Sequence, residues 1–187
     1  SAGSASSRRS ASASASATSP AAQACREDRR CQAALLIDGT MVFDIVEVRP
    51  DNTLEITGQP FPAPMMQINS GILYDMPRYQ DGYAPNRAAF ERASLPAFNL
   101  VIEQANHMNL TDLPLLLARP VFGLFNDPQM KTGPIDPELC MRTLNAYNLA
   151  FFDQYLKSQP SPLLTGPSPD YSFVRYQARN AALASQK

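Results

Sequence analysis

The sequence has little of what marks a disulfide scaffold or a metalloprotein. It contains one histidine and three cysteines in 187 residues, and no two cysteines are spaced as Cys-x-x-Cys. An odd number of scattered cysteines argues against a disulfide framework or a zinc site, so we expect Cys25, Cys31 and Cys140 to be buried free thiols. The acidic residues show no metal-ligand spacing either. We therefore predict neither a metal ion nor a cofactor.

Long charged runs and long apolar runs are also missing. The formal net charge is −1, and no five like charges follow one another, which argues against a nucleic acid as partner. No apolar stretch approaches the roughly 20 residues needed to cross a bilayer, so we expect a soluble chain with no transmembrane segment. The first residues do not form a secretion signal and include no start methionine. The sequence therefore reads as the interior of a longer protein and predicts no particular compartment.

The chain divides by composition into three parts. Residues 1–19 are rich in serine and alanine, which is typical of a flexible low-complexity segment. Residues 20–176 hold enough apolar side chains for one domain with its own core. Ser19-Pro20 is a capping residue followed by proline, and it predicts a short helix through Cys25. The polar residues 177–187 are expected to form a frayed tail.

Three short stretches predict the strands of the domain. Residues 33–37 form a continuous apolar run without alternation, as in parallel strands that are covered on both faces, and the second and third candidates lie at residues 64–69 and 98–103. A helix-like stretch at residues 86–94 separates the second run from the third, so the order indicates βαβ units in a doubly wound α/β sheet. Residues 44–58 contain a turn signal and predict a hairpin or small excursion.

A long helix is predicted after the third strand. Asp136-Pro137-Glu138 combines a cap, a proline and an acid that suits the positive end of a helix. Apolar residues then recur every three or four positions, which favours a helix packed on the sheet. This stripe consists of Cys140, Leu144, Tyr147, Phe151 and Tyr155.

Two titratable residues lie just past the ends of predicted strands. Asp38 ends the first apolar run, and His107 comes shortly after the third. Functional groups of open α/β sheets gather at the carboxyl ends of the strands, so the two side chains are expected to meet there. A carboxylate that accepts a hydrogen bond from imidazole Nδ1–H leaves Nε2 to take a proton from a serine. Taken singly, Asp38 could be a turn former and His107 a packed residue.

The segments around these residues resemble the plasma-type platelet-activating factor acetylhydrolase family of α/β hydrolases. Residues 36–40, Leu-Ile-Asp-Gly-Thr, are similar to the family's acid loop, and residues 64–70 to the strand that follows it. Residues 106–113 resemble the family's histidine segment, and residues 144–157 its C-terminal helix. The resemblance extends from about Ala21 to Tyr176 and implies the C-terminal half of an α/β-hydrolase fold. It implies Asp38 and His107 as catalytic acid and base.

The nucleophile that such a triad needs has no complete motif in this sequence. The expected pattern is Gly-x-Ser-x-Gly, and Ser1-Ala2-Gly3 matches its second half. Ser1 is the candidate nucleophile, and the backbone N–H of Ala2 is then the candidate oxyanion donor. The alternative is that residues 1–19 are an unrelated linker and that the serine lies upstream.

The resulting functional expectation is hydrolysis of a small-molecule or lipid ester through an acyl-enzyme. The resemblance implies short-acyl esters, including phospholipids acetylated at the sn-2 position. One alternative is a general carboxylesterase or polyester-type hydrolase that uses the same triad. A second alternative is a catalytically incomplete fragment that serves as a binding module. The oligomeric state is left open.

Overall fold

The computed structural model describes residues 20–117 and 119–181. At its centre is a four-stranded sheet with the order β1 (Ala34–Ile37), β4 (Met65–Ser70), β5 (Ala97–Ile102) and β6 (Val174–Arg179). β1, β4 and β5 are parallel, and β6 runs antiparallel to β5. The three parallel strands are the three that the sequence predicts. The mixed α/β class with a mostly parallel sheet is thus confirmed.

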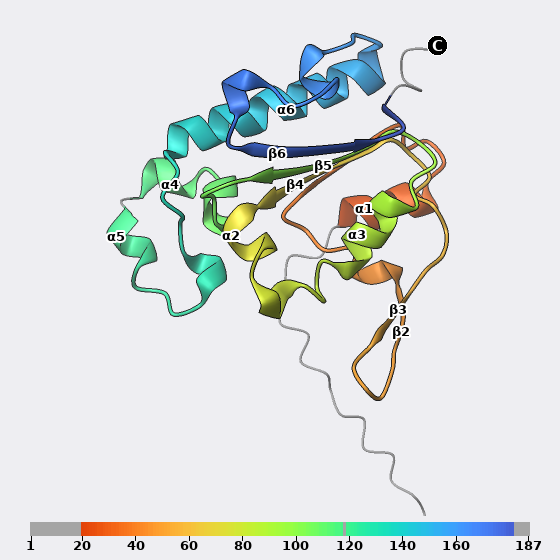
Figure 1. The fold of residues 1–187 in the computed structure, drawn as a ribbon, viewed down its shortest axis with the longest axis horizontal. Coiled ribbons are helices and arrows are strands. Elements are labelled where there is room, and N and C mark those ends of the chain that lie inside the picture. The colour runs from red at the N-terminus through yellow and green to blue at the C-terminus, as the bar shows by residue number, and fades with distance from the viewer. Residues whose placement is uncertain (1–19, 118, 182–187) are drawn as a thin grey trace, which may run out of the picture.

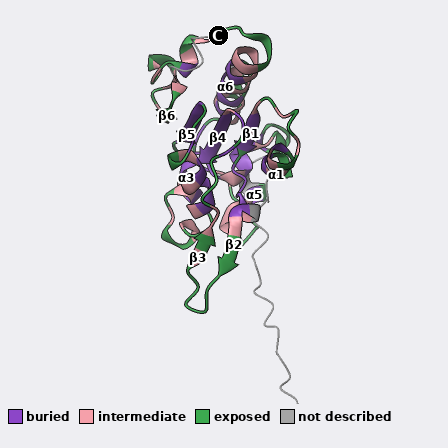
Figure 2. Cartoon of the chain, turned by 90° about the vertical axis from the view of Figure 1, so that its right-hand side faces the viewer, coloured by how far each residue is buried: buried purple, intermediate pink, exposed green. Residues whose placement is uncertain are grey.

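Helices cover both faces of this sheet. The long helix α6 (Pro137–Lys157) lies along one face, and α1 (Pro20–Glu27) and α3 (Ala84–Glu91) lie on the other (Figure 1). Every residue of β4 and of β5 is buried, and these two strands form the buried centre of the molecule in Figure 2. Because both faces are covered, the polar side chains of these strands find partners inside the protein: Gln67 Nε2 donates to Asn86 O at 2.9 Å, and Asn69 Nδ2 donates to Asn99 Oδ1 at 2.8 Å.

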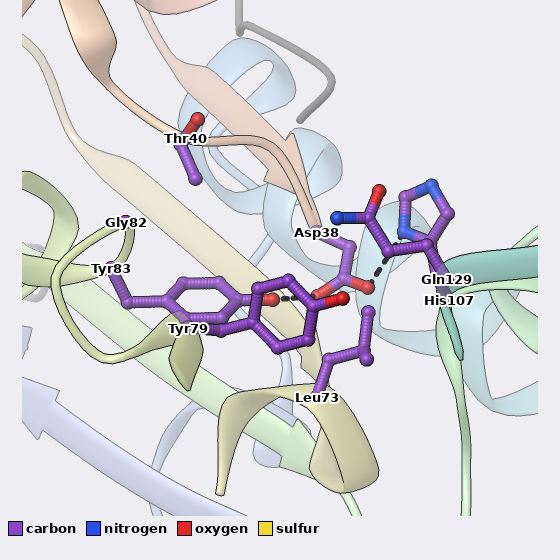
Figure 3. Close-up of a pocket in the computed structure, with 8 residues that line it drawn as sticks. All are labelled: Asp38, Thr40, Leu73, Tyr79, Gly82, Tyr83, His107 and Gln129. Atoms are coloured by element: carbon purple, nitrogen blue, oxygen red, sulfur yellow. Dashed lines mark hydrogen bonds and ion pairs between the residues drawn. The ribbon is translucent and has the colours of Figure 1, made fainter. Parts of the chain in front are cut away.

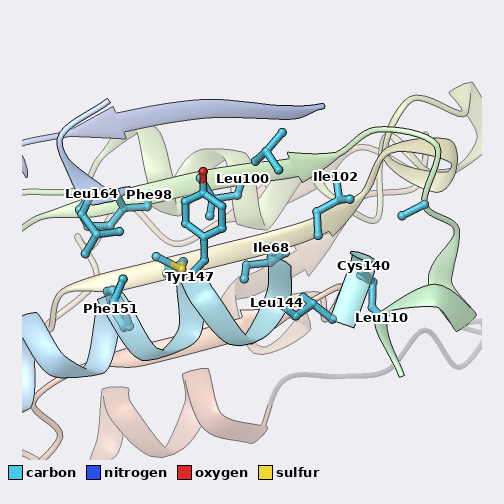
Figure 4. Close-up of a cluster of buried hydrophobic side chains, with 14 of the residues drawn as sticks. Ile68, Phe98, Leu100, Ile102, Leu110, Cys140, Leu144, Tyr147, Phe151 and Leu164 are labelled. Carbon is cyan, nitrogen blue, oxygen red and sulfur yellow. The ribbon is translucent and has the colours of Figure 1, made fainter. Parts of the chain in front are cut away.

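The position of α6 follows from its cap and its apolar stripe. The Asp136 side chain accepts a hydrogen bond from the Leu139 N–H at 2.8 Å, which satisfies one of the free donors at the start of the helix. The stripe faces the sheet as expected and packs against β4 and β5 (Figure 4). Its members Cys140, Tyr147 and Phe151 are at most 1% exposed.

Short elements connect the layers. The excursion at residues 44–58 is an antiparallel hairpin of β2 (Ile45–Val48) and β3 (Leu54–Ile56), as predicted, and it projects away from the sheet (Figure 1). The short α-helices are α2 (Gly71–Tyr74), α4 (Leu113–Leu116) and α5 (Arg119–Phe122). The single 3-10 turns are η1 (Val42–Asp44), η2 (Pro77–Tyr79), η3 (His107–Leu110), η4 (Pro128–Met130), η5 (Pro162–Leu164) and η6 (Pro169–Tyr171).

The expectation of a frayed tail from Gln177 onward is wrong for its first residues. Gln177 lies within β6 and is paired with Asn99 of β5, whose side-chain Nδ2 donates to Gln177 Oε1 at 2.9 Å. β6 is an edge strand with one well-exposed face, so polar residues suit it. Its polar sequence therefore does not indicate a strand.

The expectation of three free thiols is wrong for two of them. Cys25, near the end of α1, and Cys31, just before β1, form a disulfide with their Cα atoms 5.1 Å apart. The turn between them, in which the Cys31 N–H donates to the Asp28 carbonyl at 3.0 Å, brings them within disulfide range. Cys140 is a buried free thiol, as predicted.

Candidate active site

Asp38 directly follows β1, and the buried side chain of Asn86 from α3 holds the loop that begins there. Its backbone has a positive φ of 47°, and its N–H donates to the Ile68 carbonyl of the neighbouring strand at 2.8 Å. The next residues are held by Asn86, whose Nδ2 donates to Gly39 O at 2.8 Å and whose Oδ1 accepts from Met41 N at 2.9 Å. A non-glycine residue rarely adopts positive φ unless its surroundings impose it. These contacts supply that constraint.

The carboxylate of Asp38 accepts four hydrogen bonds. Oδ1 accepts from Ser70 N at 3.0 Å and from Tyr83 OH at 2.8 Å. Oδ2 accepts from Ser70 Oγ at 2.6 Å and lies 2.8 Å from His107 Nδ1. The side chain of Asp38 is only 1% exposed, so these partners replace the water that a carboxylate would otherwise bind.

His107 is held by the turn in which it lies. It opens η3, and its backbone N–H donates to the side chain of Asn106 at 2.9 Å. The side chain of Asn109 accepts from the backbone N–H of Asn106 at 2.9 Å, and it also accepts from Gly133 N. Asn106 Nδ2 in turn donates to the Pro128 carbonyl at 2.8 Å. Reciprocal capping of this kind fixes the turn, and it therefore fixes the backbone position from which the His107 side chain extends.

The electrostatics favour a protonated His107. Its hydrogen bond to Asp38 raises the pKa of the imidazole above its usual value against the opposing effect of burial, and Asp127 contributes a smaller attraction. Burial raises the pKa of the Tyr83 phenol strongly, and the nearby charge of Asp38 adds to this. Tyr83 is therefore a neutral donor at every physiological pH.

Asp38, Tyr83 and His107 line one small pocket (Figure 3). Tyr79, Tyr83 and Leu73 form one wall, and His107 stands with Gln129 at the other side. Figure 3 shows the second ring nitrogen of His107, Nε2, pointing away from Asp38. The imidazole side chain is 25% exposed, whereas Asp38 is covered. A base that is oriented by a buried acid and open on its other nitrogen can accept a proton from a hydroxyl.

The structure brings together two of the four site residues that the sequence predicts. Asp38 and His107 are in hydrogen-bond contact, while Ser1 and Ala2 lie outside the described residues, so their roles stay predictions. Sequence reasoning missed Ser70, although it ends the second buried strand just as Asp38 follows the first, and this position is a usable signal. It also missed Tyr83, for which no local signal exists.

Within residues 20–117 and 119–181, no group of three or more His, Cys, Asp or Glu side chains is arranged to hold a metal ion. In the same ranges, no helix combines the length and the apolar character that crossing a bilayer requires.

In its fold the chain is similar to a solved structure of a ferulic acid esterase from Streptomyces cinnamoneus. The TM-score is 0.60 at 23% sequence identity, and the match covers 82% of this chain and 42% of the esterase chain. This chain thus spans less than half the length of that esterase. No protein-family model and no curated protein matches the sequence. The likeness concerns the fold alone, and the resemblance to platelet-activating factor acetylhydrolases stays a prediction.

Proposed function

We propose that this chain is the C-terminal half of an α/β-hydrolase-type ester hydrolase and carries the acid and the base of its triad. One observation carries the proposal, namely the 2.8 Å contact between Asp38 Oδ2 and His107 Nδ1. The acid is buried and the base is partly open, which is the arrangement that orients an imidazole for proton transfer. The order of acid and then histidine at strand ends is that of α/β hydrolases downstream of the nucleophile.

The proposed reaction proceeds through an acyl-enzyme. The Ser1 hydroxyl attacks the ester carbonyl while its proton passes to His107 Nε2, and Asp38 stabilises the imidazolium through Nδ1–H. The backbone N–H of Ala2 donates to the oxyanion of the tetrahedral intermediate. The intermediate collapses as the proton on Nε2 passes to the departing alcohol. Water then attacks the acyl group and gives its proton to His107 Nε2. This second tetrahedral intermediate collapses as the proton returns to the serine oxygen, which releases the carboxylic acid.

Fluorophosphonate labelling tests the triad. The protein in the form in which the cell makes it is treated with the probe, and the modified residue is mapped by mass spectrometry. We expect one adduct, on Ser1, that is lost in Ser1→Ala and strongly slowed in His107→Gln. An adduct on a serine upstream would move the nucleophile and keep the triad. If the intact, folded protein takes up no probe, it is no serine hydrolase, and the binding-module alternative replaces the proposal.

The proposed substrates are short-acyl esters. The resemblance described above implies acetylated phospholipids, and the structural neighbour is described as a ferulic acid esterase. Hydrolysis of p-nitrophenyl acetate, of a phospholipid acetylated at sn-2 and of methyl ferulate separates these classes. We expect the two acetyl esters to be cleaved with the higher kcat/KM. Preference for methyl ferulate would indicate an aromatic acyl site, and cleavage of p-nitrophenyl acetate alone would indicate a general carboxylesterase.

Replacing the acid tests its role separately. Asp38→Asn keeps the shape of the side chain but stops it from stabilising the imidazolium and from fixing the reactive tautomer of His107. We expect kcat on p-nitrophenyl acetate to fall about a thousandfold or more, since removal of the equivalent charge from a triad has an effect of this size. The KM should change little. A variant that folds and retains more than a tenth of the wild-type kcat would contradict the role of Asp38.

A further inference from the structure

The Asp38 carboxylate has two hydroxyl partners that the proposed reaction does not use. Ser70 Oγ donates to Oδ2 at 2.6 Å, and Tyr83 OH donates to Oδ1 at 2.8 Å. Ser70 is 0% exposed and Tyr83 is 5% exposed. Water therefore has little access to either donor, and the effect of each hydroxyl on the carboxylate is not screened by solvent.

The hydroxyl of Ser70 does not bond to the helix that it precedes. Ser70 is the N-cap residue of α2, where a serine side chain ordinarily accepts a hydrogen bond from the first turn of the helix. Here it makes no such cap bond and donates to Asp38 instead. Tyr83 precedes α3, and its ring packs against Tyr74 with the centroids 5.1 Å apart. Both hydroxyls are thus aimed at the acid by the fold.

We propose that Ser70 and Tyr83 are positioning residues that act through Asp38 and limit how strongly His107 holds its proton. The assignment of a catalytic role to this effect rests on the proposed function. The effect itself concerns only the described residues, and it can be measured without a substrate.

The direction of the effect follows from the hydroxyl dipoles. Each O–H points its positive end at the carboxylate and offsets part of the negative potential that Asp38 creates at the imidazole. Among the described residues, the charged groups that face His107 are Asp38 at the end of β1 and Asp127 just before η4, and both favour the imidazolium. The two hydroxyls oppose them. They thereby keep a larger fraction of His107 in the neutral form that a general base requires.

His107 is the single histidine of this sequence. In the intact protein, the imidazole resonances that disappear in His107→Gln identify His107 in an NMR pH titration. We expect the pKa of His107 to rise by about half a unit to one unit in Ser70→Ala and in Tyr83→Phe, because each variant removes one donor from the buried carboxylate. The double variant should show the larger rise.

Two further variants separate this effect from general disturbance of the site. Tyr79→Phe is the matched control, since it removes a hydroxyl from the same pocket and no contact between that hydroxyl and Asp38 occurs among the described residues. It should leave the pKa of His107 unchanged. Ser70→Thr keeps a hydroxyl and should restore the wild-type value. If Ser70→Ala proves unable to fold, Tyr83→Phe alone carries the test.

The outcomes distinguish this proposal from the triad itself. An unchanged or lowered pKa of His107 in a folded Tyr83→Phe variant overturns the inference, whatever the protein hydrolyses. If the pKa of His107 rises in the variants but the protein does not react with fluorophosphonate, the inference is supported and the proposed triad is contradicted. If both proposals hold, the acid limb of the pH profile of kcat/KM moves to higher pH in the same variants and by the same amount.

Discussion

Asn109 links the two stretches of chain that hold His107 in place. Its Oδ1 accepts from the backbone N–H of Asn106 and from that of Gly133, and the residue is 1% exposed. Gly133 leaves no space for a side chain, since an added Cβ would lie 2.0 Å from the Gln104 carbonyl oxygen. The side-chain oxygen of Asn109 is therefore the buried acceptor for the backbone N–H groups of both Asn106 and Gly133.

We predict that Asn109→Ala lowers both stability and activity. Two buried N–H groups would lose their acceptor, and the free energy of unfolding should fall by about 2–3 kcal/mol. The kcat should fall with it, because η3 then no longer fixes His107. Urea unfolding and ester hydrolysis check this, with Asn145→Ala on the exposed side of α6 as control. Equal stability of the two variants would contradict the prediction.

The sequence predicts those site residues that lie at the end of a strand. Asp38 and His107 were marked in this way, and Ser70 could have been. Tyr83 could not, because it lies 45 residues from Asp38 in sequence and no local pattern distinguishes it from the nearby Tyr79. Its role depends on how α3 packs on the sheet.

At the scale of elements, a covered ion pair joins α1 to the base of the hairpin. Arg26 Nη2 donates to Asp44 Oδ2 at 2.6 Å, and the two side chains are 16% and 4% exposed. The guanidinium also lies over the Phe61 ring, 5.2 Å from its centroid. A second pair, between Arg49 and Glu55 on the hairpin itself, is about half exposed.

We predict that the two pairs differ sharply in their effect on stability. Asp44→Asn leaves the covered charge of Arg26 without its partner and should lower the free energy of unfolding by about 3 kcal/mol. Glu55→Gln, the matched control, should change it by less than about 1 kcal/mol because solvent screens that pair. Chemical denaturation under non-reducing conditions measures both. A loss of similar size in the two variants would show that burial does not distinguish them.

Strands and helices with a clear apolar or capping pattern could be predicted from the sequence, and those without one could not. The Asp136-Pro137 cap and the apolar stripe were sufficient to place α6. β6 reads as a polar tail because its outer face is exposed and only its pairing with β5 makes it a strand. The disulfide was missed for a similar reason. Spacing alone does not reveal that a turn brings Cys25 and Cys31 together.

For the whole molecule, the raised pKa of His107 predicts a dependence of stability on pH. The folded state binds this proton more tightly than the unfolded state does. The stabilisation by His107 is therefore complete below the unfolded pKa of about 6.5, and it is lost as the pH rises through the higher folded pKa.

This is measured by urea unfolding of the wild type and of His107→Gln at pH 5.5 and at pH 8.5. The advantage of the wild type over the variant should shrink at the higher pH. Asp38→Asn, which removes the charge that holds the proton, should lose most of this dependence. A difference that grows with pH would mean that the site favours neutral imidazole.

The sequence by itself determined which segments are buried and where strands end, because hydrophobic patterns and caps act over neighbouring residues. That was enough to place Asp38 and His107 at one edge of a mostly parallel sheet. Only the tertiary structure decided what surrounds the acid. Its partners Ser70, Tyr83 and His107 lie 32, 45 and 69 residues away along the chain. The order of the strands and the packing of α3 bring them together, and neither is encoded in a local pattern.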